Sequence, residues 1–129
     1  ENGEKKAVPL AVSAPFHCSL MEPAAEAMRE ALSDAAISAP KIPLIANVTA
    51  ATTTAPEAIR DQLVTQVTGR VRWRESVEFM AANGIAGTAE AGAGKVLTVM
   101  TRRTARDIKG VTLGTPEDLQ AFAEALQGE

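Results

Sequence analysis

The chain has 129 residues, 46% of them hydrophobic, a composition typical of one folded domain rather than a disordered segment. Its net charge of −3 excludes the dominant basic surface of a nucleic-acid-binding protein, and no apolar run approaches the length of a membrane helix or a signal peptide, so no nucleic acid and no membrane is expected as a partner. One cysteine and one histidine exclude a disulfide framework and a tetrahedral zinc site of the usual ligands, and they favour a cytoplasmic location.

The first part of the chain predicts a strand, a turn and a helix. Residues 7–13 are apolar, with Pro9 placing the strand at an edge or a bulge, and residues 14–17 form a turn. A capping-box pattern at Ser19 and Glu22 indicates a helix start. Six apolar side chains at helical spacing are expected to face inward over residues 20–35: Leu20, Ala24, Ala27, Met28, Ala31 and Leu32.

The rest of the chain alternates in the same way. The predicted strands are residues 44–48, 85–90 and 111–113. One predicted helix runs from a Thr54–Glu57 capping box to a C-cap at Gly69. Three more are predicted over residues 74–83, over about 95–103, and from Thr115 to the end of the chain. Strands that alternate with helices indicate an α/β domain with a largely parallel sheet.

His17 is the only histidine, and it lies in the turn between a predicted strand and a helix. Such turns are where α/β enzymes place catalytic groups, and imidazole exchanges protons near neutral pH. A histidine that merely bonds a neighbouring carbonyl is an equally open interpretation of the residues alone. Adjacent side chains rarely face each other, so Cys18 is predicted to be a small core residue rather than a partner nucleophile. No Gly-x-Ser-x-Gly nucleophile elbow occurs in the sequence.

A glycine-rich loop over residues 92–95 opens a predicted helix. It fails the phosphate-loop pattern, because Ala89 stands where the first glycine is required and Val96 follows Lys95. Its expected role is a close backbone approach that lets the helix pack, although it can still offer N–H groups at the helix start.

A basic segment carries Arg70, Arg72 and Arg74 around the only tryptophan, Trp73, in an otherwise acidic chain. A solvated helix start is the simpler interpretation, with Trp73 as a core or interface anchor. The functional alternative is a docking surface for an acidic partner.

Four segments, in this order and spacing, resemble the C-terminal portion of malonyl-CoA:acyl carrier protein transacylase: residues 8–18, 44–49, 66–73 and 92–97. The resemblance implies that residues 14–129 form the C-terminal part of a large, mainly parallel-sheet, hydrolase-like acyltransferase subdomain. It implies that residues 1–13 end a small ferredoxin-like subdomain. The implied activity is transfer of a malonyl group from malonyl-CoA to the pantetheine thiol of acyl carrier protein through an acyl-serine, in fatty acid biosynthesis. No bound cofactor is implied, since malonyl-CoA and phosphopantetheine enter as substrates.

The resemblance also implies roles for individual residues. His17 matches the histidine base, and Gln66 matches a glutamine whose main-chain carbonyl orients that histidine. Because that contact is made by the backbone, Gln66→Ala is expected to be nearly silent unless the local helix end shifts. Phe16 matches an acyl-selectivity position, where a bulky ring suits malonyl and crowds a branched acyl group.

Other family features are absent from the sequence or altered. The serine elbow, the oxyanion donors and the arginine for the malonyl carboxylate belong to the family's N-terminal part, so this chain is expected to be one piece of the enzyme, inactive alone. Ala93 replaces a usual proline, and residues 89–91 replace a more apolar strand, which is expected to loosen the loop. Alone, the piece is expected to expose sheet edges and to aggregate or oligomerise.

Two alternatives remain open from the sequence. One is a non-catalytic module that docks acyl carrier protein through the three arginines of the basic segment. The other is an acyltransferase domain of a polyketide synthase.

Overall fold

The structure, a computed structural model, describes residues 12–127. Its elements are the 3-10 turn η1 (Ser19–Met21), α1 (Glu22–Ser33), β1 (Leu44–Ile45), β2 (Thr52–Thr53), α2 (Pro56–Thr68), α3 (Trp73–Ala82), β3 (Gly87–Ala91), α4 (Val96–Thr104), β4 (Lys109–Leu113) and α5 (Pro116–Gln127). Over this range, each helix is too short or too polar to cross a bilayer.

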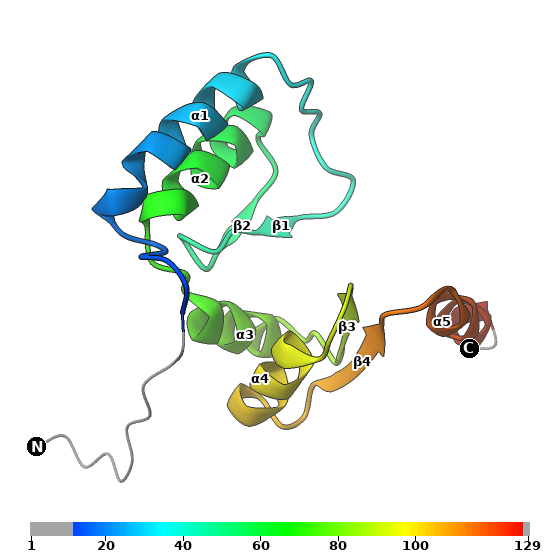
Figure 1. Cartoon of the computed structure of the whole chain (residues 1–129). Coiled ribbons are helices and arrows are strands. Elements are labelled where there is room, and N and C mark those ends of the chain that lie inside the picture. Colours follow the sequence, from blue (N-terminus) through cyan, green and yellow to red (C-terminus); the bar gives the residue numbers. More distant parts are fainter. Residues whose placement is uncertain (1–11, 128–129) are drawn as a thin grey trace, which may run out of the picture.

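The first half of the fold is a pair of helices over a small hairpin. α1 lies along α2, and β1 pairs with β2 in an antiparallel ladder (Figure 1). Ala25 of α1 and both Ile59 and Val64 of α2 are buried. Pro56 stands in the first turn of α2, where its missing N–H leaves no hydrogen bond unmade.

The second half is built on a parallel βαβ unit. β3 and β4 pair in parallel register from Gly87–Lys109 to Ala91–Leu113, and α4 connects them. α3 packs against α4, and its Val77 is fully buried. α5 contacts β4 and is the outermost helix of this half in Figure 1.

The predicted helices are confirmed within residues 12–127, and the prediction of a largely parallel sheet is confirmed only for β3 and β4. The strand expected over residues 44–48 stops at Ile45, because Ala46 begins a turn in which its carbonyl accepts the N–H groups of Thr49 and Ala50. That turn sends the chain back as an antiparallel hairpin. The strand expected over residues 7–13 lies largely outside the described residues, and Val12 and Ser13 are not in a strand.

The capping boxes predicted at Ser19 and Thr54 are wrong. α1 begins after Met21 and α2 after Ala55, and neither N-cap residue makes a side-chain hydrogen bond. Each helix instead carries a proline in its first turn, which removes one of the N–H groups that a cap would satisfy.

The predicted inward face of α1 is also wrong within the described chain. Leu20 is 73% exposed and Met28 40% exposed, whereas Ala25 is the buried residue of this helix. α1 packs against α2, and helical periodicity marks an apolar stripe without saying which neighbouring element covers it.

Candidate active site

His17 lies in the turn before η1, exposed to solvent and with a backbone φ of 57°. This left-handed conformation costs a non-glycine residue roughly 1–2 kcal/mol, and such strained residues cluster at functional sites. The turn is closed by the N–H of Phe16, which donates to the carbonyl of Ala14 at 2.9 Å.

The imidazole of His17 is held by a residue 49 positions further along the chain. Its Nδ1 lies 2.8 Å from the main-chain carbonyl oxygen of Gln66. A carbonyl oxygen can only accept, so Nδ1 carries the proton and donates it. In the neutral ring Nε2 is then the unprotonated nitrogen, available to take a proton.

Gln66 can offer its carbonyl because it lies in the last turn of α2. The last four carbonyls of a helix have no intrahelical N–H partner. Gly69, the C-cap, turns the chain away in an extended conformation, and its N–H bonds to the carbonyl of Thr65. A Cβ on Gly69 would lie 2.8 Å from that same oxygen, so close approach requires the glycine predicted at this position.

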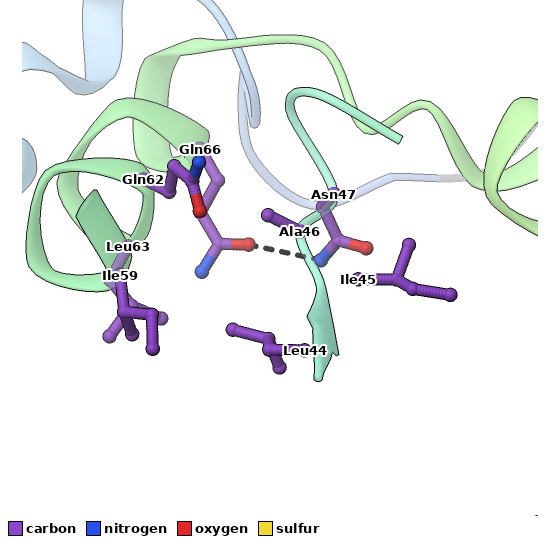
Figure 2. A pocket seen from close by; sticks show the side chains of 8 residues that line it. All are labelled: Leu44, Ile45, Ala46, Asn47, Ile59, Gln62, Leu63 and Gln66. Atoms are coloured by element: carbon purple, nitrogen blue, oxygen red, sulfur yellow. Dashed lines mark hydrogen bonds between the residues drawn. The ribbon is translucent and has the colours of Figure 1, made fainter. Parts of the chain in front are cut away.

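The side chain of Gln66 is fixed as well. Its Oε1 accepts a hydrogen bond of 3.0 Å from Nδ2 of Asn47, as Figure 2 shows. Both residues line a pocket of about 140 Å³ between α2 and β1, together with Leu44, Ile45, Ala46, Ile59, Gln62 and Leu63. Sequence reasoning missed Asn47, whose only signal was its position inside a segment that resembles the transacylases.

Phe16 and Cys18 flank the histidine. Phe16 is 54% exposed, so its ring is available to contact a bound molecule or another polypeptide. The prediction that Cys18 is a core residue is wrong, because it is only half-buried. Its thiol donates to the carbonyl of Pro15 at 3.0 Å, which supports the turn.

The three arginines of the basic segment are paired with glutamates of α3. Glu75 Oε1 lies 2.9 Å from Nη2 of Arg70 and 3.4 Å from Nε of Arg72. Nε of Arg74 lies 4.0 Å from Oε1 of Glu78. Arg72 also donates to the carbonyl of Thr49 at 2.9 Å. Arg72 therefore connects the turn of the hairpin to α3. The side chains of Arg70 and Arg74 are more open to solvent, at 77% and 73% exposed.

The glycine loop has a different role from the one expected. Gly92 and Gly94 have φ values of 123° and 97°, and a Cβ on either would meet nothing within 4 Å. Backbone conformation, not close approach, requires these glycines.

The start of α4 is already occupied by a side chain. The carboxylate of Glu90 accepts the N–H of Leu97 at 3.1 Å and that of Thr98 at 2.7 Å. Hydrogen bonds from Thr98, followed by that from Leu97, hold the pKa of Glu90 below its ordinary value. The N–H groups that an anion could have bound are therefore partly taken.

Comparison with known proteins finds malonyl transferases similar to this chain. No family model matches the chain. The malonyl CoA-acyl carrier protein transacylase of Escherichia coli is 42% identical over 122 residues, which are 95% of this chain and 40% of that protein. The crystal structure of an acyl-carrier-protein-S-malonyltransferase from Bartonella henselae aligns with a TM-score of 0.85 and 52% identity, over 97% of this chain and 40% of that one.

A third match comes from the structure of a type II PKS acyl-carrier protein in complex with its malonyl-transacylase. The matching chain of that structure aligns with a TM-score of 0.82 and 37% identity, over 95% of this chain and 40% of the matching chain. The chain therefore spans about 40% of the length of these proteins. The resemblance seen in the sequence is confirmed: over nearly its whole length, this chain is similar to malonyl CoA-acyl carrier protein transacylases.

Proposed function

We propose that the chain is part of a malonyl-CoA:acyl carrier protein transacylase and that His17 is the general base of that enzyme. The observation that supports this role is the bond of 2.8 Å from Nδ1 of His17 to the carbonyl of Gln66, which leaves Nε2 as the proton acceptor. A base in a nucleophile–base pair needs such an orienting acceptor, and a main-chain carbonyl can replace the usual carboxylate.

In this proposal the nucleophile is a serine on polypeptide outside these residues. Nε2 of His17 takes the serine proton as the oxygen attacks the malonyl thioester, and the proton then passes to the departing CoA sulfur. In the second half-reaction Nε2 takes the proton of the pantetheine thiol, whose sulfur attacks the acyl-serine. The serine oxygen leaves and recovers the proton, so the imidazole ends as it began.

The remaining parts of the enzyme follow from the same resemblance. Residues 14–129 belong to the large hydrolase-like subdomain, and residues 1–13 end the small ferredoxin-like subdomain. The N-terminal part supplies the serine, the oxyanion donors and the arginine for the malonyl carboxylate. This assignment fits a chain that spans about 40% of its relatives. The enzyme acts in the cytoplasm on malonyl-CoA and phosphopantetheine and holds no bound cofactor.

Phe16 is proposed to set acyl selectivity. Its ring is exposed and adjacent to His17, where it can form one wall of the acyl site. Because one extra methyl group changes binding by about 1–3 kcal/mol, Phe16→Ala is expected to admit branched acyl groups without abolishing malonyl transfer.

Carrier docking through Arg70, Arg72 and Arg74 belongs to the same proposal. The solved complex of a similar malonyl-transacylase with its acyl-carrier protein supports a carrier as the partner. A purely non-catalytic module is less favoured, since the similar proteins reported above are named as transferases.

A chimera tests the proposal. Residues 1–129 replace the matching stretch of the Escherichia coli relative, and malonyl transfer from labelled malonyl-CoA to carrier protein is measured. The chimera is expected to be active, and His17→Ala is expected to lower kcat by about 10²- to 10⁴-fold. Cys18→Ser, in the adjacent residue, is the matched control and should retain activity. A folded chimera whose rate is unchanged by His17→Ala contradicts the assignment.

A further inference from the structure

Gln66 makes two hydrogen bonds to parts of the chain that are distant in sequence. Its main-chain carbonyl accepts from His17. Its side-chain carbonyl accepts from Asn47, the bond drawn in Figure 2. One residue thus connects the candidate base to the turn after β1. The bond to Asn47 is partly buried, so water competes with it less than at an open surface.

Asn47 is a firmly held donor. Its own carbonyl accepts the N–H of Arg72 at 2.8 Å, and the guanidinium of Arg72 donates to the carbonyl of Thr49 two residues on. The neighbouring Ala46 and Ala50 are 6% and 8% exposed, so both ends of the turn are packed. The amide of Asn47 therefore projects from a fixed backbone.

The carbonyl that orients His17 lies at a helix end, which is the part of a helix most prone to fray. Fraying of the last turn of α2 would move the Gln66 oxygen away from Nδ1. An error of about 1 Å in such an arrangement can lower a rate about a hundredfold. A side-chain bond that holds Gln66 in place opposes that movement.

We propose that Asn47 is a positioning residue for His17: by holding the side chain of Gln66, it keeps the Gln66 carbonyl where it fixes the Nδ1–H tautomer of the imidazole. This inference rests on the proposed function of His17 as a base. Asn47 acts through Gln66 and is not itself placed against a reacting atom.

The tautomer of His17 is the direct readout, and it is independent of activity. His17 is the only histidine, so ¹⁵N-histidine labelling of the untagged chain gives one pair of ring nitrogen signals. Solid-state NMR records them even if the chain self-associates. Asn47→Leu, which keeps the approximate shape and removes the donor, is expected to lower the Nδ1–H fraction and raise the Nε2–H fraction.

Two further variants separate positioning from simple destabilisation. Asn47→Asp can keep a hydrogen bond to the Gln66 side chain, because the Gln66 amide can flip and donate to the carboxylate. The His17 tautomer in this variant should therefore remain close to that of the parent chain. Asn83→Leu is the matched control. Asn83 Nδ2 also donates to a carbonyl, that of Phe79 at 2.8 Å, but at the end of α3. Its loss should leave the His17 signals unchanged.

The chimera supplies the catalytic arm. Asn47→Leu is expected to lower kcat about ten- to a hundredfold with little change in KM, and Asn47→Asp is expected to restore most of the loss. If Asn47→Leu lowers thermal stability but leaves the tautomer unchanged, the positioning role is overturned. If the tautomer shifts as expected while the parent chimera transfers no malonyl, the positioning stands and the proposed function falls.

Discussion

Nδ1 of His17 lies 2.8 Å from the carbonyl oxygen of Gln66, although 49 positions separate the two residues in the sequence. One residue comes from an exposed turn and the other from the last turn of a helix, so only the tertiary fold brings them together. The contact depends on the placement of a main-chain atom, which no substitution at Gln66 removes directly. Changes at Gln66 act through the side chain that anchors that atom.

Gln66→Ala is therefore expected to be measurable rather than nearly silent. It leaves the Asn47 amide without its partner in a partly buried position, which typically costs about 1–3 kcal/mol of unfolding free energy. Gln62→Ala, one turn earlier on α2, is the matched control. Oε1 of Gln62 is buried and finds no partner among the described residues, so its removal should be close to neutral. Urea unfolding of the chimera compares the two, and equal losses contradict the expectation.

Removal of Glu75 is expected to strengthen carrier binding if the basic segment docks the carrier. The carboxylate of Glu75 pairs with both Arg70 and Arg72, so Glu75→Gln leaves these positive charges available to an acidic partner. Arg70→Ala and Arg74→Ala should act in the opposite direction. Association rates of the chimera with acyl carrier protein at low and high salt test this, since the differences should shrink with salt. A Glu75→Gln variant with an unchanged rate removes this segment from the docking surface.

Arg72 cannot serve as a clean test of docking. Its guanidinium also holds the carbonyl of Thr49, so Arg72→Ala changes the turn that carries Asn47.

Local patterns in the sequence predicted the secondary structure better than they predicted the contacts between distant residues. Helical spacing located α2 and α3. The end of α2 at Gly69 was also predicted correctly, and the structure shows why a glycine is needed there: a Cβ would lie too close to the carbonyl oxygen of Thr65. Periodicity failed at α1, where Leu20 and Met28 are exposed and Leu32 is only half-buried. The Asn47–Gln66 bond has no sequence signature, because it joins a turn and a helix whose approach is set by packing between them.

The candidate site divides in the same way. The resemblance named Gln66 as the orienting residue, and the structure places its carbonyl beside His17. The pairing of the arginines with Glu75 and Glu78 was missed, although the two glutamates closely follow the three arginines in the sequence. A charge pattern gives the sign of a segment, whereas only side-chain geometry shows which charges neutralise one another.

Glu90 is expected to make α4 sensitive to acid. Because hydrogen bonds from Thr98 and then Leu97 lower the pKa of this carboxyl in the folded chain, its stabilising contribution is present above the unfolded pKa and is lost as the pH falls through the folded pKa. Glu90→Gln can still accept one N–H and should lose less stability at neutral pH than Glu90→Ala. Urea melts of the chimera from neutral to acidic pH measure this. A difference between Glu90→Ala and the parent that is the same at every pH contradicts the expectation.

Gly94→Ala is expected to destabilise the loop before α4. At a φ of 97° an alanine is strained even though the space around its Cβ is open, and the cost is about 1–2 kcal/mol. Gly87→Ala in β3 is the matched control, since a Cβ there makes an ordinary contact of 3.7 Å with the Lys109 carbonyl and no positive φ is involved. Thermal melts of the two chimera variants should differ, with Gly94→Ala the lower. The reverse order would mean that the loop adopts another conformation.

The chain alone is expected to self-associate. Leu20, Leu119 and Leu126 are 73%, 53% and 61% exposed, and β3 and β4 form a two-stranded sheet whose outer edges have no strand partner within residues 12–127. Apolar faces and open strand edges of this kind recruit other chains. Light scattering after size-exclusion chromatography should show oligomers or aggregates at micromolar concentration. Leu119→Lys with Leu126→Lys should lower the mass, whereas Lys109→Arg, which keeps the charge of β4, should not. A parent chain that stays monomeric and melts cooperatively at all concentrations contradicts the idea that these faces require a covering polypeptide.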